Sequence, residues 1–128
     1  MAVSCGNDIV KVSRIKNSIE TIGETFIKRI YTEEEISYCE SRRMCKYQSY
    51  AVRFAAKEAV YKALSPVDDS DATWKDIEIK REKNGKPRVN LNGFLGEYAK
   101  NKGIKTDKID ISLSHDDDFA IATVVIEY

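Results

Sequence analysis

The helical pattern from Tyr47 to Leu64 restricts the fold more than any other feature of the chain. Apolar residues recur there every three or four positions, which is the spacing of one helix face. These residues are Val52, Ala55, Ala56, Ala59, Val60 and Ala63. Because most of them are alanines, we expect another element to pack closely against this face. Ser65-Pro66 follows, and the helix is predicted to end there because proline cannot continue it.

The rest of the chain alternates between strand and helix patterns. Strands are predicted at residues 3–12, around 77–79 and 89–91, at 109–114 and at 119–127, and helices at about 14–22, 33–41 and 93–102. Ser13 is the expected cap of the first helix, and Thr32 with Glu35 has the spacing of a capping box at the second. Asn84-Gly85 is a common hairpin turn pair. The sequence therefore predicts an α+β fold in which a largely antiparallel sheet packs against the long central helix.

Length and charge set limits on partners and location. The 128 residues fit a single domain that spans residues 1–128. Lys and Arg total 21, and so do Asp and Glu, so the net charge gives no general attraction to nucleic acid or to a membrane. No apolar run approaches the roughly 20 residues that cross a bilayer, and the first eight residues do not resemble a signal peptide. We expect a cytoplasmic protein in which Cys5, Cys39 and Cys45 are small, semi-buried free thiols.

The first predicted strand contains a carboxylate. Asp8 shares a strand face with Gly6, Val10 and Val12, all of which are small or apolar. A charge on such a face needs a partner or a metal ion. An aspartate at a strand end or on the surface is the structural alternative, and the pattern alone does not decide between the two.

The long helix contributes a second carboxylate and a lysine. Glu58 and Lys62 are four residues apart, so they are neighbours at the flank of the alanine face. Exposed pairs at this spacing are common and stabilise a helix only slightly. In a functional site, Glu58 would join Asp8 as an oxygen ligand for Mg²⁺, which takes few protein ligands and retains waters. Lys62 would then reach a phosphate or act as a base.

Two further segments add polar groups. Asn84-Gly85-Lys86-Pro87 combines a flexible glycine with a charge, although an ordinary exposed hairpin has a similar composition. Ser112 and Ser114 share a strand face and precede His115, the one histidine of the chain, so a zinc site is not indicated. A Ser-His-Asp triad stays open, but no nucleophile-elbow motif is present. Taken together with the two carboxylates and the lysine, these groups suit a magnesium–pyrophosphate substrate better than an acyl or peptide one.

Four segments resemble the bacterial holo-acyl-carrier-protein synthases, the small class of 4′-phosphopantetheinyl transferases. They are Gly6-Asn7-Asp8-Ile9-Val10 with Arg14-Ile15; Arg53-Phe54-Ala55-Ala56-Lys57-Glu58-Ala59 with Lys62-Ala63-Leu64; Asn84-Gly85-Lys86-Pro87; and Ile111-Ser112-Leu113-Ser114-His115-Asp116 with Ala120-Ile121-Ala122. The second segment is highly specific, and order and spacing fit across nearly the whole chain. The resemblance implies a 4′-phosphopantetheinyl transferase-like fold, typically in a homotrimer with active sites between subunits.

The resemblance also implies a reaction and residue roles. The 4′-phosphopantetheine arm of coenzyme A would move to a serine of an apo acyl carrier protein, and adenosine 3′,5′-bisphosphate would leave. Asp8 and Glu58 match the Mg²⁺ ligands, Lys62 matches a lysine near the reacting phosphates, and Arg14 matches a basic position that meets the carrier protein. The positions that match the coenzyme A pocket are Arg53, Lys62, Gly85, Lys86, Pro87, Ser112, Ser114 and His115.

Two other functions fit part of this pattern. A magnesium-dependent nuclease also uses Asp, Glu and Lys, but its Glu and Lys usually lie two apart on a strand, and a neutral chain has little attraction for DNA. A non-catalytic module that binds coenzyme A or a carrier would be expected to lack Asp8, Glu58 or Lys62. The chain departs from the family at Val52, where a small residue is usual, at Ser49-Tyr50, where apolar residues are usual, and at Val67 to Thr73, which contains three aspartates where family members are often glycine-rich. The acidic segment leaves the shape of the coenzyme pocket open and does not affect Asp8, Glu58 or Lys62. Separately, the sequence does not specify the carrier or whether acyl-coenzyme A is accepted.

Overall fold

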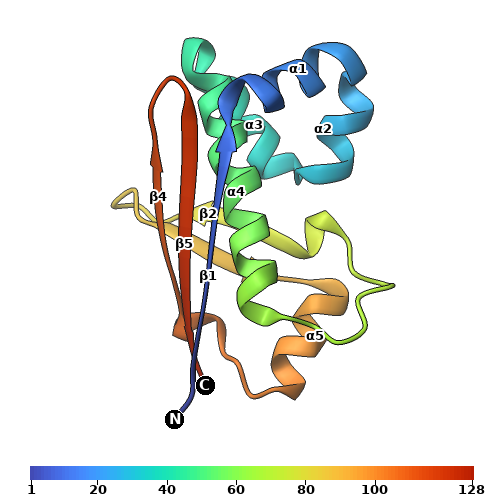
Figure 1. The fold of residues 1–128 in the computed structure, drawn as a ribbon, viewed down its shortest axis with the longest axis vertical. Coiled ribbons are helices and arrows are strands. Elements are labelled where there is room, and N and C mark those ends of the chain that lie inside the picture. Colours follow the sequence, from blue (N-terminus) through green and yellow to red (C-terminus); the bar gives the residue numbers. More distant parts are fainter.

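The alanine-rich helix is α4 (Lys46–Leu64), and it packs against a three-stranded antiparallel sheet in the computed structural model, which describes residues 1–128. The strand order is β1 (Val3–Lys11), β5 (Phe119–Glu127) and β4 (Ile109–His115). Figure 1 shows the three strands along the long axis of the molecule, with both termini at the same end. Backbone hydrogen bonds between Ala2 and Tyr128 join those termini. The predicted α+β fold with a central helix is therefore confirmed.

Close contact between α4 and β1 explains the small residues of the helix. A Cβ added to Gly6 would lie 2.1 Å from the carbonyl oxygen of Ala59 and 2.9 Å from the backbone nitrogen of Ala63, so only glycine fits there. Next to it, the Ser4 hydroxyl donates to the Ala63 carbonyl at 2.6 Å. Ala55 and Ala59 are completely buried. Strand and helix therefore approach almost backbone to backbone, as the alanine pattern predicted.

Three helices cover one end of α4. They are α1 (Val12–Ile22), α2 (Glu24–Ile30) and α3 (Glu33–Ser41), which Figure 1 shows grouped at the end opposite the termini. The capping box of Thr32 and Glu35 is present at the start of α3, as predicted. The Ser13 cap was wrong: α1 follows β1 directly, and the Val12 N–H is satisfied by the Asp118 carbonyl at 2.9 Å. Helix α2 was missed because only Gly23, with φ of +80°, separates it from α1.

The remaining elements form a second, smaller layer. Strands β2 (Ile77–Arg81) and β3 (Pro87–Leu91) pair as an antiparallel hairpin in a sheet of their own, and α5 (Gly93–Asn101) follows. Gly85 lies in the connecting turn with φ of +87°, a conformation that favours glycine. Strand β3 contacts β4, which places the hairpin turn beside the edge of the larger sheet. None of the helices is both long and apolar enough to cross a membrane.

A buried ion pair attaches the hairpin to α4. The Lys57 ammonium lies 2.8 Å from Glu35 Oε1, and both side chains are at most 1% exposed. Lys57 also donates to the carbonyls of Trp74 and Ile77, and Glu35 accepts the Ile79 N–H at 2.9 Å. Burial lowers the pKa of Lys57, although Glu35 opposes that shift. One pair of charges thus joins α3, α4 and the start of β2.

Replacing Lys57 with methionine is expected to lower the free energy of unfolding by about 3–5 kcal/mol, because Glu35 would remain charged and buried without its partner. Urea unfolding monitored by circular dichroism measures this change. Lys46→Met is the matched control, since Lys46 is on the same helix but forms a partly exposed pair with Glu40. The double variant Glu35→Gln/Lys57→Met should lose less stability than the sum of its single variants, and additive losses would contradict the pairing.

Candidate active site

Asp8 and Lys62 meet where β1 crosses the C-terminal half of α4. The Lys62 ammonium lies 3.1 Å from Asp8 Oδ1 and donates to the Asn7 carbonyl at 3.1 Å. The Asp8 side chain is 18% exposed, whereas Lys62 is 51% exposed. The predicted strand alternation therefore holds: Asp8 lies on the face that packs on the helix, between the buried Gly6 and Val10. The Lys62 ammonium thus covers the Asp8 carboxylate, and this lysine is accessible to a ligand from solvent.

Glu58 lies one turn before Lys62 on α4 and is half-buried. Burial raises the pKa of Glu58, and repulsion from Asp8 raises it further, while Lys62 and Arg14 lower it. The two carboxylates are thus close enough to repel each other. Arg14, on the first turn of α1, is exposed and close enough for its charge to act on Glu58. The structure therefore gathers Asp8, Glu58, Lys62 and Arg14 in one region, which we call the acidic site.

The acidic site has a donor set that fits Mg²⁺. No third carboxylate, histidine or cysteine joins Asp8 and Glu58 in a cluster. Two carboxylates are nevertheless typical for this ion, which keeps several waters and takes its other ligands from substrate phosphates. A cation between the two carboxylates would also relieve the repulsion that raises the pKa of Glu58. Zinc is not favoured here, because it prefers nitrogen and sulfur ligands.

A second group of predicted residues lines a different cavity, of about 380 Å³. The predicted residues that line it are Arg53, Gly85, Pro87, Ser112 and His115. They come from α4, the hairpin turn and β4, three parts of the chain that the fold brings together. We call this space the arginine cavity.

Three guanidinium groups surround one tyrosine ring in the arginine cavity. The guanidinium carbons of Arg53, Arg81 and Arg42 lie 4.4, 4.9 and 5.8 Å from the centre of the Tyr38 ring. Arg81 also donates to the Tyr38 hydroxyl. Of these four residues the sequence pointed only to Arg53, because Tyr38, Arg42 and Arg81 lie outside the segments that resemble the family. Their shared position around the Tyr38 ring arises only in the folded chain, where α3 and β2 face α4.

Arg53 itself is built into the wall of this cavity. It is 5% exposed and donates to the Ser49 hydroxyl at 2.9 Å, but its Nε has no partner. An unpaired buried donor is costly unless a ligand satisfies it. No aspartate or glutamate lines the arginine cavity, so its positive charges are not neutralised at short range. The cavity is therefore suited to an anion.

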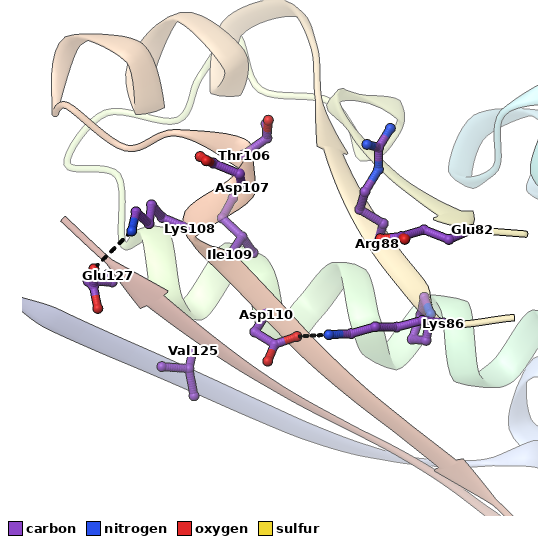
Figure 2. Close-up of a pocket in the computed structure, with 11 residues that line it drawn as sticks. Glu82, Lys86, Arg88, Thr106, Asp107, Lys108, Ile109, Asp110, Val125 and Glu127 are labelled. Atoms are coloured by element: carbon purple, nitrogen blue, oxygen red, sulfur yellow. Dashed lines mark ion pairs between the residues drawn. The ribbon is translucent and has the colours of Figure 1, made fainter. Parts of the chain in front are cut away.

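Three of the eight residues predicted for the coenzyme pocket lie outside the arginine cavity. The Lys86 ammonium pairs with Asp110 at 3.3 Å and lines a separate polar cavity of about 520 Å³ between β3 and β4, which Figure 2 shows with a second ion pair between Lys108 and Glu127. Ser114 is exposed on β4 and borders neither space. The third is Lys62, which lies in the acidic site.

The acidic segment that departs from the family borders Glu58. Glu58 lines a cavity of about 320 Å³ together with Tyr61, Asp69 and Trp74. The Tyr61 hydroxyl donates to Asp69, so one of the three aspartates holds the loop against α4. The Trp74 ring stacks on Phe54, with the ring centres 4.9 Å apart. The loop is therefore a wall of the space beside the acidic site.

Comparison with known proteins identifies the class to which this fold and these residues belong. The family model described as the 4′-phosphopantetheinyl transferase superfamily matches residues 4–124, and the chain belongs to this superfamily. The chain is similar to the holo-[acyl-carrier-protein] synthase of Ruminiclostridium cellulolyticum, with 46% identity over 126 residues that cover 98% of this chain and 92% of the relative.

Solved structures agree with this assignment. The holo-[acyl-carrier-protein] synthase of Helicobacter pylori in complex with coenzyme A aligns with a TM-score of 0.81 and 32% identity over 96% of this chain and 99% of that one. The synthase of Neisseria meningitidis aligns with a TM-score of 0.85 and 30% identity over 98% of both chains. The family, the fold class and the transferase function predicted from the sequence are therefore confirmed.

Glu58 should destabilise the metal-free protein when it is ionised, because its pKa is raised in the folded state. Below its ordinary pKa of 4.5 the group is protonated both in the folded and in the unfolded chain, so it costs nothing there. The cost develops as the pH rises above that value and through the raised pKa of the folded state. Without metal, Glu58→Gln should therefore raise the melting temperature at pH 7, and the gain should vanish on acidification below pH 4.5. Thermal melts across this pH range test the sign, with Glu97→Gln on α5 as an exposed control.

Proposed function

We propose that this chain transfers the 4′-phosphopantetheine group of coenzyme A to a serine of an apo acyl carrier protein and releases adenosine 3′,5′-bisphosphate. The observation that carries the proposal is the acidic site, in which two carboxylates and Lys62 meet in a chain of this superfamily. Such a site can hold a cation and still present a positive charge to a phosphate. The nuclease alternative has no comparable support, because the matching proteins are synthases of the acyl-carrier-protein type.

Asp8 and Glu58 are the proposed ligands of Mg²⁺. When bound, the ion would offset the charge that develops on the leaving bisphosphate. Lys62 adds a second positive charge, and its 51% exposure leaves it able to turn from Asp8 toward a phosphate. Electrostatic stabilisation of this kind and the positioning of the reactants supply most of the rate in phosphoryl transfer.

The arginine cavity is the proposed binding place for the bisphosphate end of coenzyme A. A planar guanidinium group can donate two parallel hydrogen bonds to two oxygens of one phosphate, which makes arginine suitable for binding this group. The unpaired Nε of Arg53 and the absence of acidic residues in the lining support an anionic occupant. We retain the predicted roles of Gly85, Pro87, Ser112 and His115 in this pocket, and propose Arg42 and Arg81 as additional contacts. For Lys86 and Ser114 the proposed contact with coenzyme A would require a different position of the ligand or of the side chain.

A homotrimer would complete the site. The outward face of the sheet, opposite α4, exposes Val3, Ile9, Phe119, Ile121 and Val125, each at 39–63% of its surface. Ile9 and Ile121 are directly paired across β1 and β5, and the polar pair of Asn7 and Thr123 separates them from Val125 on the same face. Exposed patches of this kind usually mark an interaction surface. We propose that copies of the chain meet there and that the arginine cavity of one copy serves the acidic site of its neighbour.

The proposed location is the cytoplasm. Cys5, Cys39 and Cys45 are all free thiols, which is typical of a reducing compartment. The expectation that they are semi-buried was wrong, since Cys39 is buried and the other two are exposed. The carrier protein itself, whether of the fatty-acid or another type, is proposed only as a class.

Incubation of a purified apo acyl carrier protein with this protein, coenzyme A and Mg²⁺ should raise the carrier's intact mass by one phosphopantetheine. EDTA should abolish the gain because it removes the cation from Asp8 and Glu58. Glu58→Gln should slow the reaction by about 100-fold or more, because loss of even a hydrogen-bond partner of a metal ligand costs roughly 10–100-fold, whereas Glu97→Gln should not slow it. Mass spectrometry follows the product. A stable complex with the carrier and no mass gain would instead indicate a binding module, and full activity of Glu58→Gln would contradict the metal assignment.

Arg14→Glu should weaken carrier binding by roughly tenfold, which corresponds to about 1.4 kcal/mol. Arg14 is exposed on α1, and reversal of its charge would repel an acidic partner. Because the charge of Arg14 also acts on Glu58, the affinity should be measured by calorimetry without turnover rather than from rates. Lys100→Glu, an equally exposed reversal on α5, is the control. Unchanged affinity for the carrier would remove Arg14 from the docking surface.

A further inference from the structure

Cys45 lies at the junction between a short 3-10 helix, Arg43–Cys45, and the start of α4. It is the N-cap residue of that 19-residue helix, it is exposed, and it lines the arginine cavity. The N-terminus of a helix favours negative charge beside it. A free thiol is therefore present at the rim of a space whose other features attract anions.

A second, independent observation points to an anionic ligand in this space. Arg53 is only 5% exposed, and its Nε is the one buried side-chain polar atom of the chain without a hydrogen-bond partner. Arg42 and Arg81 add two charges around the Tyr38 ring, and no carboxylate lines the cavity. A small anion that enters the cavity would be concentrated beside the Cys45 thiol.

The other two cysteines have different surroundings. Cys39 is completely buried, its sulfur accepts from the Ser49 hydroxyl, and burial raises its pKa to about 11. Cys5 is exposed on the outward face of β1, where Val125 is its cross-strand partner. The chain therefore contains one inert thiol, one exposed thiol in an apolar setting and one exposed thiol beside three arginines.

We propose that Cys45 is a modification site for anionic low-molecular-weight disulfides. The Cys45 thiol loses its proton to solvent and its sulfur attacks one sulfur of the disulfide. A new S–S bond forms, the original one breaks, and the other half leaves as a thiolate. The half that stays occupies the arginine cavity with its negative charge against the guanidinium groups. The adduct would also block the binding of coenzyme A, and this consequence rests on the proposed function. The disulfide reaction itself does not depend on that function.

Reaction rates with two disulfides of different charge test the proposal. The probes are anionic 5,5′-dithiobis(2-nitrobenzoate) and neutral 4,4′-dithiodipyridine, and peptide mass mapping assigns each adduct to a cysteine. The preference for the anionic over the neutral reagent should be at least about tenfold greater at Cys45 than at Cys5 at low ionic strength, and should shrink in high salt. Cys45→Ser should remove the fast phase. Arg81→Gln should slow only the anionic reagent, since Arg81 is exposed and its replacement leaves the buried wall intact.

Equal reagent preference at Cys45 and Cys5, or no effect of Arg81→Gln, would overturn the proposal. Neither result depends on catalysis, so the proposed transfer of phosphopantetheine to a carrier is tested separately by the intact-mass assay. Protection of Cys45 by adenosine 3′,5′-bisphosphate separately tests whether the nucleotide end of coenzyme A occupies the same cavity. Selective labelling without such protection would support the modification site and contradict the nucleotide placement.

Discussion

The contact of β1 with α4 at Gly6 is the constraint on which the rest of the structure depends. Strand and helix backbones touch there, because any side chain at Gly6 would collide with Ala59. Asp8, two residues further along the same strand face, is consequently held over the helix within 3.1 Å of Lys62. The acidic site is thus a product of close packing, and its carboxylate is placed by a residue that has no side chain.

Helix α4 carries both halves of the proposed active site, but on different sides. Arg53 and Glu58 are five residues apart, which corresponds to a rotation of about 140° around the helix axis and a rise of about 7.5 Å. The arginine cavity and the acidic site therefore open in different directions on one chain. The buried pair of Lys57 and Glu35 lies between them and holds the hairpin on the helix. This geometry is the physical reason for proposing that a neighbouring copy supplies the second half of each site.

The parts of the fold that were predicted correctly are those with strong local patterns. Periodic alanines located α4, strand patterns located β1 and β5, and the capping box of Thr32 and Glu35 located α3. Local rules failed where tertiary contacts replace them. Val12 obtains its hydrogen bond from Asp118 rather than from a cap at Ser13, and α2 begins after a single glycine. Arg42 and Arg81 were not predicted, because residues that gather around the Tyr38 ring share no regular spacing in the sequence.

The sequence by itself determined the family, the α+β class, and the identity of the residues that bear charge near a phosphate. It could do so because helix periodicity, strand alternation and the specific segment around Arg53 are properties of neighbouring residues. Only the tertiary structure decided which of them meet. It separated Lys86, which pairs with Asp110, from the arginine cavity, and it brought Arg14 within range of Glu58. Such distances depend on how distant elements pack, and short-range patterns do not contain that information.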